Sequence, residues 1–175
     1  MDEDERLLIE RAKSNPQNFG PLYDRYAEDV YRFILSRTHN PDEAENLTAD
    51  TFYKALKSVK NFRGEASFES YLLRIAINTV YDWFKRKKYA NLVPDYGEYE
   101  LKNEELRKLL EEIEKLPLRE REVIRMHYIE GKEPSEIEFI LNISKSNFYR
   151  LLNGALYRLR NEMEKNEQQG NYWGN

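Results

Sequence analysis

The 175-residue sequence contains no cysteine, so it can form neither disulfide bonds nor thiolate metal sites. Its two histidines, His39 and His127, are far apart in the sequence, and neither has a motif partner. This scarcity argues against a zinc site and against histidine-based catalysis. No glycine-rich phosphate loop and no nucleophile motif occurs either, which disfavours an enzyme. We therefore expect no cofactor, no metal and no catalytic residue.

Long apolar runs are absent as well. No run approaches the ~20 residues needed to span a bilayer, and the acidic start MDEDER is the opposite of a signal peptide. We therefore expect a cytoplasmic protein with no membrane insertion. The net charge of -4 is unevenly distributed: residues 81–89 contain four consecutive basic residues, whereas residues 95–114 hold eight acidic residues against three basic ones. Such asymmetry indicates a basic face and an acidic linker.

Three helical patterns separated by two abrupt stops occupy residues 118–160. The first covers residues 119–129 and ends at Glu130-Gly131, a typical C-terminal stop. The short second one begins at Glu133-Pro134, and a turn at Asn142-Ile143 leads to a third helix that Ser144 can cap. A short helix, a turn of about four residues and a longer helix with a polar leading face indicate a helix-turn-helix.

The third helix would place its first turns in the major groove of DNA. The side chains that then point outward are Lys145, Ser146, Asn147, Tyr149, Arg150 and Asn153. Arg150 can reach guanine, and Asn147 or Asn153 adenine, by bidentate hydrogen bonds, while Lys145 suits a phosphate. An ordinary three-helix bundle with a solvated face would show the same pattern, so the rest of the chain must decide.

The first half of the chain shows four further helical patterns. They cover residues 4–14, residues 18 to about 39, residues 42–56 with Asp42 as the cap, and residues 68–88. A loop at residues 60–67 has Gly64 as its pivot. We expect core positions for the aromatic residues Phe19, Tyr23, Tyr26 and Phe52.

Trp83 and Phe84 stand beside the basic run at residues 85–88. An aromatic and basic helix end fits unstacked bases and phosphates. A solvated helix end whose lysines satisfy the helix dipole explains the same residues equally well.

The whole pattern predicts an all-α fold of two small helical domains joined by a linker, the C-terminal domain being the helix-turn-helix. The domains are residues 1–89 and residues 104–166, the latter opening with an amphipathic helix at residues 104–116. The acidic linker is residues 90–103, and residues 167–175 form a disordered tail.

Two separated stretches resemble one family. FGPLYDRYAEDVYRF, EAENLTADTFYKAL and SYLLRIAINTVYDWFKRKK are similar to region 2, and KLPLREREVIRMHYIEGKEPSEIEFILNIS to the start of region 4, of the extracytoplasmic-function (group IV) sigma factors. This resemblance covers residues 19–163. It implies an alternative sigma factor without a catalytic site of its own. Such a factor binds core RNA polymerase and directs promoter recognition, melting and transcription initiation, under the control of an anti-sigma factor.

The resemblance also implies roles for single residues. The helix over residues 43–52 would bind polymerase through Glu45, Asn46, Leu47, Asp50, Thr51 and Phe52. The minus-10 element, as a melted strand with a flipped base, would contact Phe62, Arg63, Gly64, Arg74, Asn78, Asp82, Trp83, Lys85, Arg86 and Lys87. The outward residues of the third helix would bind the minus-35 element as a duplex.

The sequence departs from the family in the polymerase-binding and recognition helices. The family usually has aspartate where Asn46 stands, and the common Thr-Val-Lys-Ser-Arg run is replaced by residues 147–151, with a later arginine replaced by Gly154. Two alternatives stay open. A helix-turn-helix transcription regulator with a helical partner-binding domain would explain residues 118–160 equally well, and a purely helical adaptor would need no DNA at all.

Overall fold

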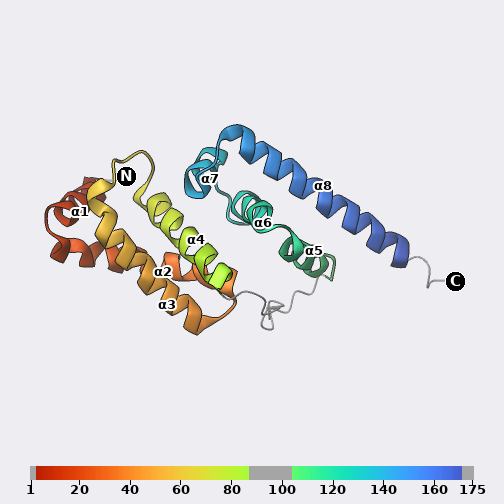
Figure 1. Ribbon diagram of the computed structural model, residues 1–175, viewed down its shortest axis with the longest axis horizontal. Helices are drawn as coiled ribbons and strands as arrows, with labels where there is room; N and C mark the ends of the chain where they lie inside the picture. Colours follow the sequence, from red (N-terminus) through yellow and green to blue (C-terminus); the bar gives the residue numbers. More distant parts are fainter. Residues whose placement is uncertain (1–2, 87–103, 171–175) are drawn as a thin grey trace. The chain divides into compact units, whose positions relative to one another are not determined.

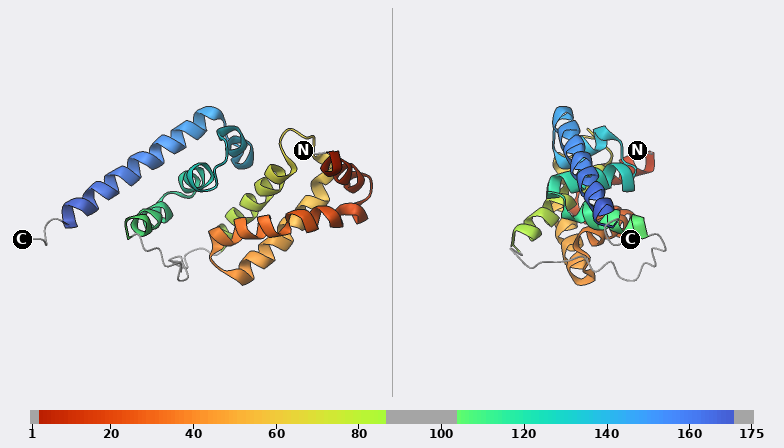
Figure 2. Two further views of the ribbon diagram at one scale, coloured as in Figure 1. Left: turned by 180° about the vertical axis from the view of Figure 1, so that it is seen from behind. Right: turned by 90° about the vertical axis from the view of Figure 1, so that its right-hand side faces the viewer.

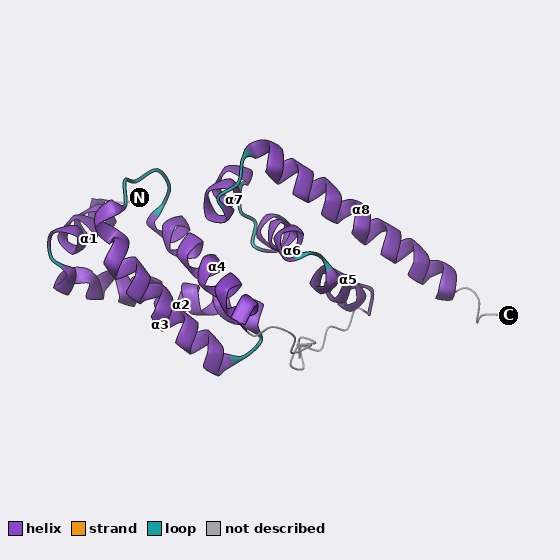
Figure 3. Cartoon of the chain, viewed as in Figure 1, coloured by secondary structure: helices purple, strands orange, loops and turns teal. Residues whose placement is uncertain are grey.

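The computed structural model describes residues 3–86 and 104–170. These fall into two compact units, one formed mainly by the elements before residue 86 and the other by those after residue 104. All regular elements in the two ranges are helices (Figures 1 and 3), which confirms the predicted fold class. No helix in these ranges is long and apolar enough to cross a bilayer. The predicted linker at residues 90–103 lies outside the described residues, as does Lys87.

The first unit is a bundle of three long helices, α2 (Gly20–Thr38), α3 (Pro41–Ser58) and α4 (Phe68–Arg86). Each of them packs against the other two. Apolar residues at helical spacing form the core between them, including Leu22, Val30, Ile34, Leu72, Ile77 and Val80. Each such side chain contributes roughly 1.5–3 kcal/mol when it is fully buried, so the core holds the three helices together.

A fourth helix, α1 (Glu3–Ser14), completes this unit. It packs against two 3-10 turns, η1 (Pro16–Phe19) and η2 (Val59–Asn61). Figures 1 and 2 show α1 and the three long helices of this unit from opposite sides. The side chain of Ile9 is buried, and the hydroxyl of Tyr26 on α2 donates a hydrogen bond to the buried carboxyl of Glu5. Burial and this contact raise the pKa of Tyr26 above its usual value, so the tyrosine keeps its proton. α1 is thereby fixed to the bundle.

The turn between α2 and α3 is built by residues other than the expected Asp42. His39 ends α2 in the left-handed conformation, with φ 49°, and its backbone N–H donates to the Leu35 carbonyl. The side chain of Asn40 then accepts from the backbone N–H of Glu43 at 2.9 Å, with Pro41 in the first turn. Because asparagine caps well and proline suits the first helical position, Asn40 takes the role that the sequence assigned to Asp42.

The loop between η2 and α4 turns at Gly64, whose φ is +74°. This left-handed conformation favours glycine, which agrees with its predicted role as the pivot. At the end of the loop, Ser67 accepts from the backbone N–H of Ser70 at 3.0 Å and so caps α4.

The second unit contains α5 (Glu104–Lys115), α6 (Leu118–Ile124), α7 (Pro134–Leu141) and α8 (Lys145–Gly170). α8 packs against both α5 and α6. The Ser144 hydroxyl accepts from the backbone N–H of Asn147 at 3.2 Å, which confirms the predicted cap. α8 continues to Gly170, so the disordered tail predicted from residue 167 was placed too early; residues 171–175 lie outside the described part.

The helix expected over residues 119–129 ends in a π turn, η3 (Arg125–Ile129). The backbone N–H of Glu130 donates to the Arg125 carbonyl at 2.9 Å, five residues earlier, and Gly131 follows with φ +66°. A π turn accommodates one extra residue in a helix, so the predicted stop at Glu130-Gly131 is right although the last turn is not α-helical.

Glu114 joins α5 to the helix that follows. Its carboxylate oxygens lie 3.0 Å from Arg121 Nη1 and 3.1 Å from Arg125 Nη1, and its side chain is only 10% exposed. One poorly solvated carboxylate therefore separates two guanidinium groups.

We predict that Glu114→Ala lowers the free energy of unfolding of the second unit by about 3 kcal/mol, because it leaves two partly buried cations side by side. Urea unfolding of the full chain measures this. Glu111→Ala, on the exposed side of the same helix, is the control and should change stability by less than about 0.5 kcal/mol. Equal effects of the two variants would contradict the role given to Glu114.

Candidate nucleic-acid and polymerase interfaces

The first turns of α8 expose one polar face. Lys145, Ser146, Tyr149, Arg150 and Asn153 are exposed and Asn147 is half-buried, whereas Phe148, Leu151 and Leu152 are buried. We call these six residues the recognition face. All of them were expected to point outward, and the structure places all of them at the surface.

Two members of the recognition face are joined. The guanidinium of Arg150 donates to Asn147 Oδ1 from Nε at 3.1 Å and from Nη2 at 2.8 Å. The two side chains were predicted to bind different bases, guanine for Arg150 and adenine for Asn147, but in the structure they bind each other.

A second polar surface follows the loop and α4 in the first unit. Arg63 and Gly64 in the loop are exposed, and so are Asn78, Asp82, Lys85 and Arg86 along the helix, with Arg74 half-buried. Residues at positions i, i+4, i+8 and beyond share one side of a helix, so the helical members form a stripe. The Asn78 side chain donates to the Arg74 carbonyl at 2.8 Å, and Lys85 Nζ lies 3.7 Å from Asp82. This stripe offers three cationic side chains and one amide to a nucleic-acid strand, with the carboxylate of Asp82 among them.

Trp83 does not belong to that surface. Its ring is 5% exposed, and its Nε1–H donates to Glu43 Oε2 on α3 at 2.8 Å. The hypothesis that Trp83 stacks on unpaired bases is therefore wrong for this conformation, because the ring lies inside the bundle. Phe84 beside it is half-buried, with the two ring centroids 4.8 Å apart.

Phe62 lies beneath the loop and not on it. The side chain is buried, and its ring centroid is 5.3 Å from that of Phe68 and 5.1 Å from that of Tyr71. Tyr71 also pairs with the Ser58 hydroxyl at 2.6 Å, and burial raises its pKa. Phe62 can thus form the floor of a base pocket, while Arg63 and Gly64 stay accessible.

The predicted polymerase-binding residues divide into two groups. Glu45, Asn46 and Asp50 are exposed on α3, but Leu47, Thr51 and Phe52 are buried. Thr51 was expected to supply an exposed polar contact; instead it is 0% exposed and donates to the Leu47 carbonyl at 2.7 Å. Leu47, Thr51 and Phe52 therefore pack α3 against the rest of the bundle.

Tyr53 is a surface residue that the sequence analysis missed. It is 57% exposed, and Lys57 Nζ lies 4.1 Å from the centroid of its ring. Successive helical residues are rotated by 100°, so Tyr53 falls between Glu45 and Asp50 on the same side of α3. Residues 45, 49, 53 and 57 are spaced four apart, and this spacing alone predicts that Tyr53 shares one side of the helix with Glu45. We call the exposed side formed by Glu45, Asn46, Asp50, Tyr53 and Lys57 the α3 face.

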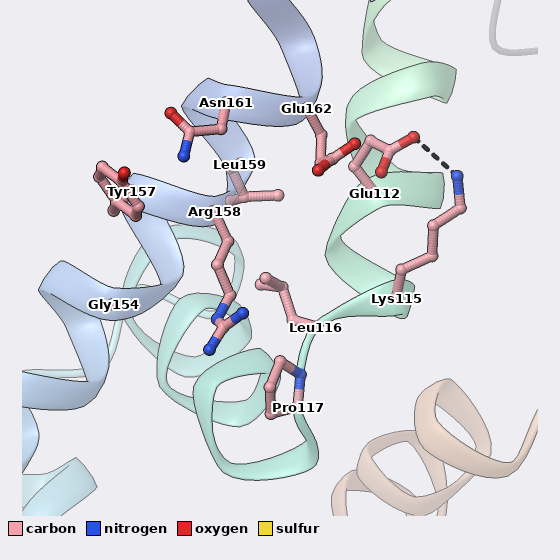
Figure 4. Close-up of a pocket in the computed structure, with 10 residues that line it drawn as sticks. All are labelled: Glu112, Lys115, Leu116, Pro117, Gly154, Tyr157, Arg158, Leu159, Asn161 and Glu162. Carbon is pink, nitrogen blue, oxygen red and sulfur yellow. Dashed lines mark hydrogen bonds and ion pairs between the residues drawn. The ribbon is translucent and has the colours of Figure 1, made fainter. Parts of the chain in front are cut away.

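The second unit also contains a groove of about 660 Å³ between the end of α5, the connection at Leu116 and Pro117, and α8 (Figure 4). Leu116 and Leu159 contribute apolar surface, and an ion pair of 2.7 Å between Lys115 and Glu112 lies at its edge. Two carboxylates, Glu112 and Glu162, and two cations, Lys115 and Arg158, line the groove, so its charges balance and it has no net positive charge to attract a phosphate backbone.

The helix-turn-helix and the separate polar surfaces of the two units fit the class of DNA-binding transcription proteins. Its sequence matches Sigma-70 region 2 over residues 22–89 and Sigma-70, region 4 over residues 106–159. The chain belongs to the extracytoplasmic-function sigma factors of RNA polymerase, which are transcription initiation factors.

Curated relatives agree with this assignment. The chain is 25% identical to the ECF RNA polymerase sigma factor SigX of Bacillus subtilis, over 85% of this chain and 84% of the relative. It is 28% identical to the RNA polymerase sigma factor YlaC of the same organism, over 83% of this chain and 89% of the relative.

Solved structures show the same fold. CnrH, in complex with the cytosolic domain of CnrY, has a TM-score of 0.65 with 23% identity, over 92% of this chain and 97% of CnrH. The sigma factor RpoE from Bartonella quintana, in complex with the anti-sigma factor NepR, has a TM-score of 0.60 with 18% identity, over 85% of this chain and 98% of RpoE.

We predict that Trp83→Ala lowers the free energy of unfolding of the first unit by about 3–5 kcal/mol, because it leaves a cavity in the bundle. Trp83→Phe retains most of the apolar volume and should cost about 1–3 kcal/mol through the lost hydrogen bond to Glu43. Denaturant unfolding measures both. A variant with wild-type stability but weakened binding to single-stranded DNA would instead return Trp83 to the DNA-binding surface.

Proposed function

We propose that the two units share the work of promoter recognition for core RNA polymerase. The α3 face binds polymerase, the loop with the outer stripe of α4 holds the melted minus-10 strand, and the recognition face binds the minus-35 duplex. The observation that carries this proposal is the presence, on two units of one chain, of two separate exposed surfaces suited to nucleic acid. The chain itself is a non-catalytic initiation subunit that acts in the cytoplasm.

The two DNA surfaces suit different forms of DNA. A helix in the major groove requires an intact duplex, and its phosphate contacts fix the register. A glycine loop above a buried aromatic floor, followed by a stripe that includes Arg74, Lys85 and Arg86, suits an extruded base and its backbone. Opening DNA without ATP costs a few kcal/mol per extruded base, which contacts to the single strand must offset.

The alternative function is that of a helix-turn-helix regulator that binds DNA without directing polymerase. It explains the recognition face equally well. It gives no role to the Gly64 loop or to the exposed aromatic on α3, and a dimer bound to a palindromic site would favour it.

The partners of the solved neighbours suggest how the chain is controlled. NepR is an anti-sigma factor, and CnrH likewise forms a complex with another protein. By extension, an anti-sigma factor would bind this chain and cover surfaces that otherwise contact polymerase and DNA.

Reconstituted transcription tests the function. Purified bacterial core polymerase and the full chain are combined on a promoter library, and the start sites are sequenced. We expect starts downstream of a shared sequence with two blocks, and none with polymerase alone. A chain that neither binds polymerase nor yields specific starts would leave the regulator as the better interpretation.

We further predict that Tyr53→Ala weakens binding to core polymerase by about 2 kcal/mol, because aromatic residues at the centre of an interface contribute most to affinity. Lys60→Ala, an exposed residue of η2 outside the α3 face, is the control and should leave affinity nearly unchanged. Titration of labelled chain with polymerase measures both. Equal affinities of Tyr53→Ala and wild type would remove the α3 face from the polymerase interface.

A further inference from the structure

Asn147 and Arg150 lie one helical turn apart on the recognition face. We propose that they form a single guanine-binding unit, in which Asn147 is a positioning residue for the guanidinium and does not itself bind adenine. This inference rests on the proposed minus-35 function of α8 and names the base that the pair selects.

The hydrogen bonds between the two side chains determine which N–H donors of Arg150 remain available to bind a base. A guanidinium has five N–H donors. The edge formed by Nε and Nη2 is occupied, because both atoms donate to Asn147 Oδ1, at 3.1 and 2.8 Å. The other edge, formed by Nη1 and the second hydrogen of Nη2, stays available. Arg150 can therefore bind a base through that edge while Asn147 holds it.

The same contacts change what Asn147 can bind. A bidentate contact to adenine needs the amide oxygen as an acceptor for N6–H and the amide nitrogen as a donor to N7. Since Oδ1 already accepts two hydrogen bonds from Arg150, Asn147 is left with donors only.

The pair as a whole thus presents only donors to the major groove. Guanine offers two acceptors there, N7 and O6, whereas adenine offers one acceptor and one donor. The pair matches guanine and opposes the N6–H₂ group of adenine. Asn153 is exposed and makes no side-chain hydrogen bond within the described residues, so it keeps both groups of its amide for an adenine.

Holding the guanidinium before binding also favours affinity. A free arginine side chain loses rotamer freedom when it binds, and a partner that orders it beforehand reduces this loss. Asn147 should therefore affect binding through Arg150, at the same base position.

Substitution of Asn147 leaves the start of α8 intact. The Ser144 cap accepts from the backbone N–H of Asn147, and alanine keeps that group. Alanine is also a better helix former than asparagine. Asn153→Ala is the matched control, with the same chemical change on the same face, and circular dichroism verifies that each variant is folded.

The experiment uses core polymerase with the full chain and a promoter library randomised at the minus-35 block. We expect Arg150→Ala and Asn147→Ala each to reduce the preference for guanine at one and the same position by about tenfold. The double variant should lose no more than the stronger single variant, because the two residues act as a unit. Asn153→Ala should alter a different position.

Replacing that guanine by 7-deazaguanine, which lacks the N7 acceptor, gives an independent readout. Wild type and Asn153→Ala should lose affinity on this promoter by about tenfold. Arg150→Ala and Asn147→Ala should bind the two promoters nearly equally.

Three results would overturn the inference. Asn147→Ala and Arg150→Ala could alter different positions, their effects could add fully, or the position that depends on Arg150 could prefer a base other than guanine. If the minus-35 block has no preference while specific starts persist, the inference and the minus-35 role fail together but the sigma function stands. Absence of specific starts rejects the proposed function itself.

Discussion

Burial of Phe148 is the constraint on which the DNA-binding surface of α8 depends. Its ring is fully buried, and the centroid of that ring lies 5.9 Å from the centroid of the His127 ring in η3. Because helical residues are rotated by 100° from one to the next, fixing Phe148 inward also directs Leu152 and Ala155 inward. The recognition face on the opposite side then has no freedom to rotate, so apolar packing determines which polar groups meet DNA.

The regular rotation between successive helical residues also explains which features could be predicted from the sequence. Helical periodicity located every long helix and the whole recognition face, since both depend on local spacing. The prediction for Trp83 was wrong because it followed the neighbouring basic residues in the sequence and not the helical spacing. Trp83 adjoins a basic run but continues the buried positions Ala76 and Val80, and its partner Glu43 is 40 residues away. The spacing contained the signal for its burial, whereas nothing local predicted the hydrogen bond.

Helix ends were less predictable than helix faces, for a physical reason. Asn40 and Asp42 are both good caps, and only the extended backbone of Asn40, with φ -139° and ψ 112°, decides between them. The π turn at Arg125–Ile129 has no distinct composition either, because it differs from an α-helix by a single hydrogen-bond step. The side-chain pair of Asn147 and Arg150 was compatible with their spacing but not determined by it, since exposed side chains have several rotamers.

Gly154 shows how a departure from the family can have a structural cause. Glycine inside a helix costs about 0.5–1 kcal/mol relative to alanine. A Cβ at this position would lie 3.2 Å from Glu120 Oε1, closer than a carboxylate oxygen normally approaches. Glu120 is itself held by Arg158 on α8, whose Nε lies 3.1 Å from Oε2. The absence of a side chain at Gly154 thus leaves room for the ion pair between Glu120 on α6 and Arg158 on α8. At the position where the resemblance to the family implies an arginine, this chain has a glycine that allows the recognition helix to pack closely on α6.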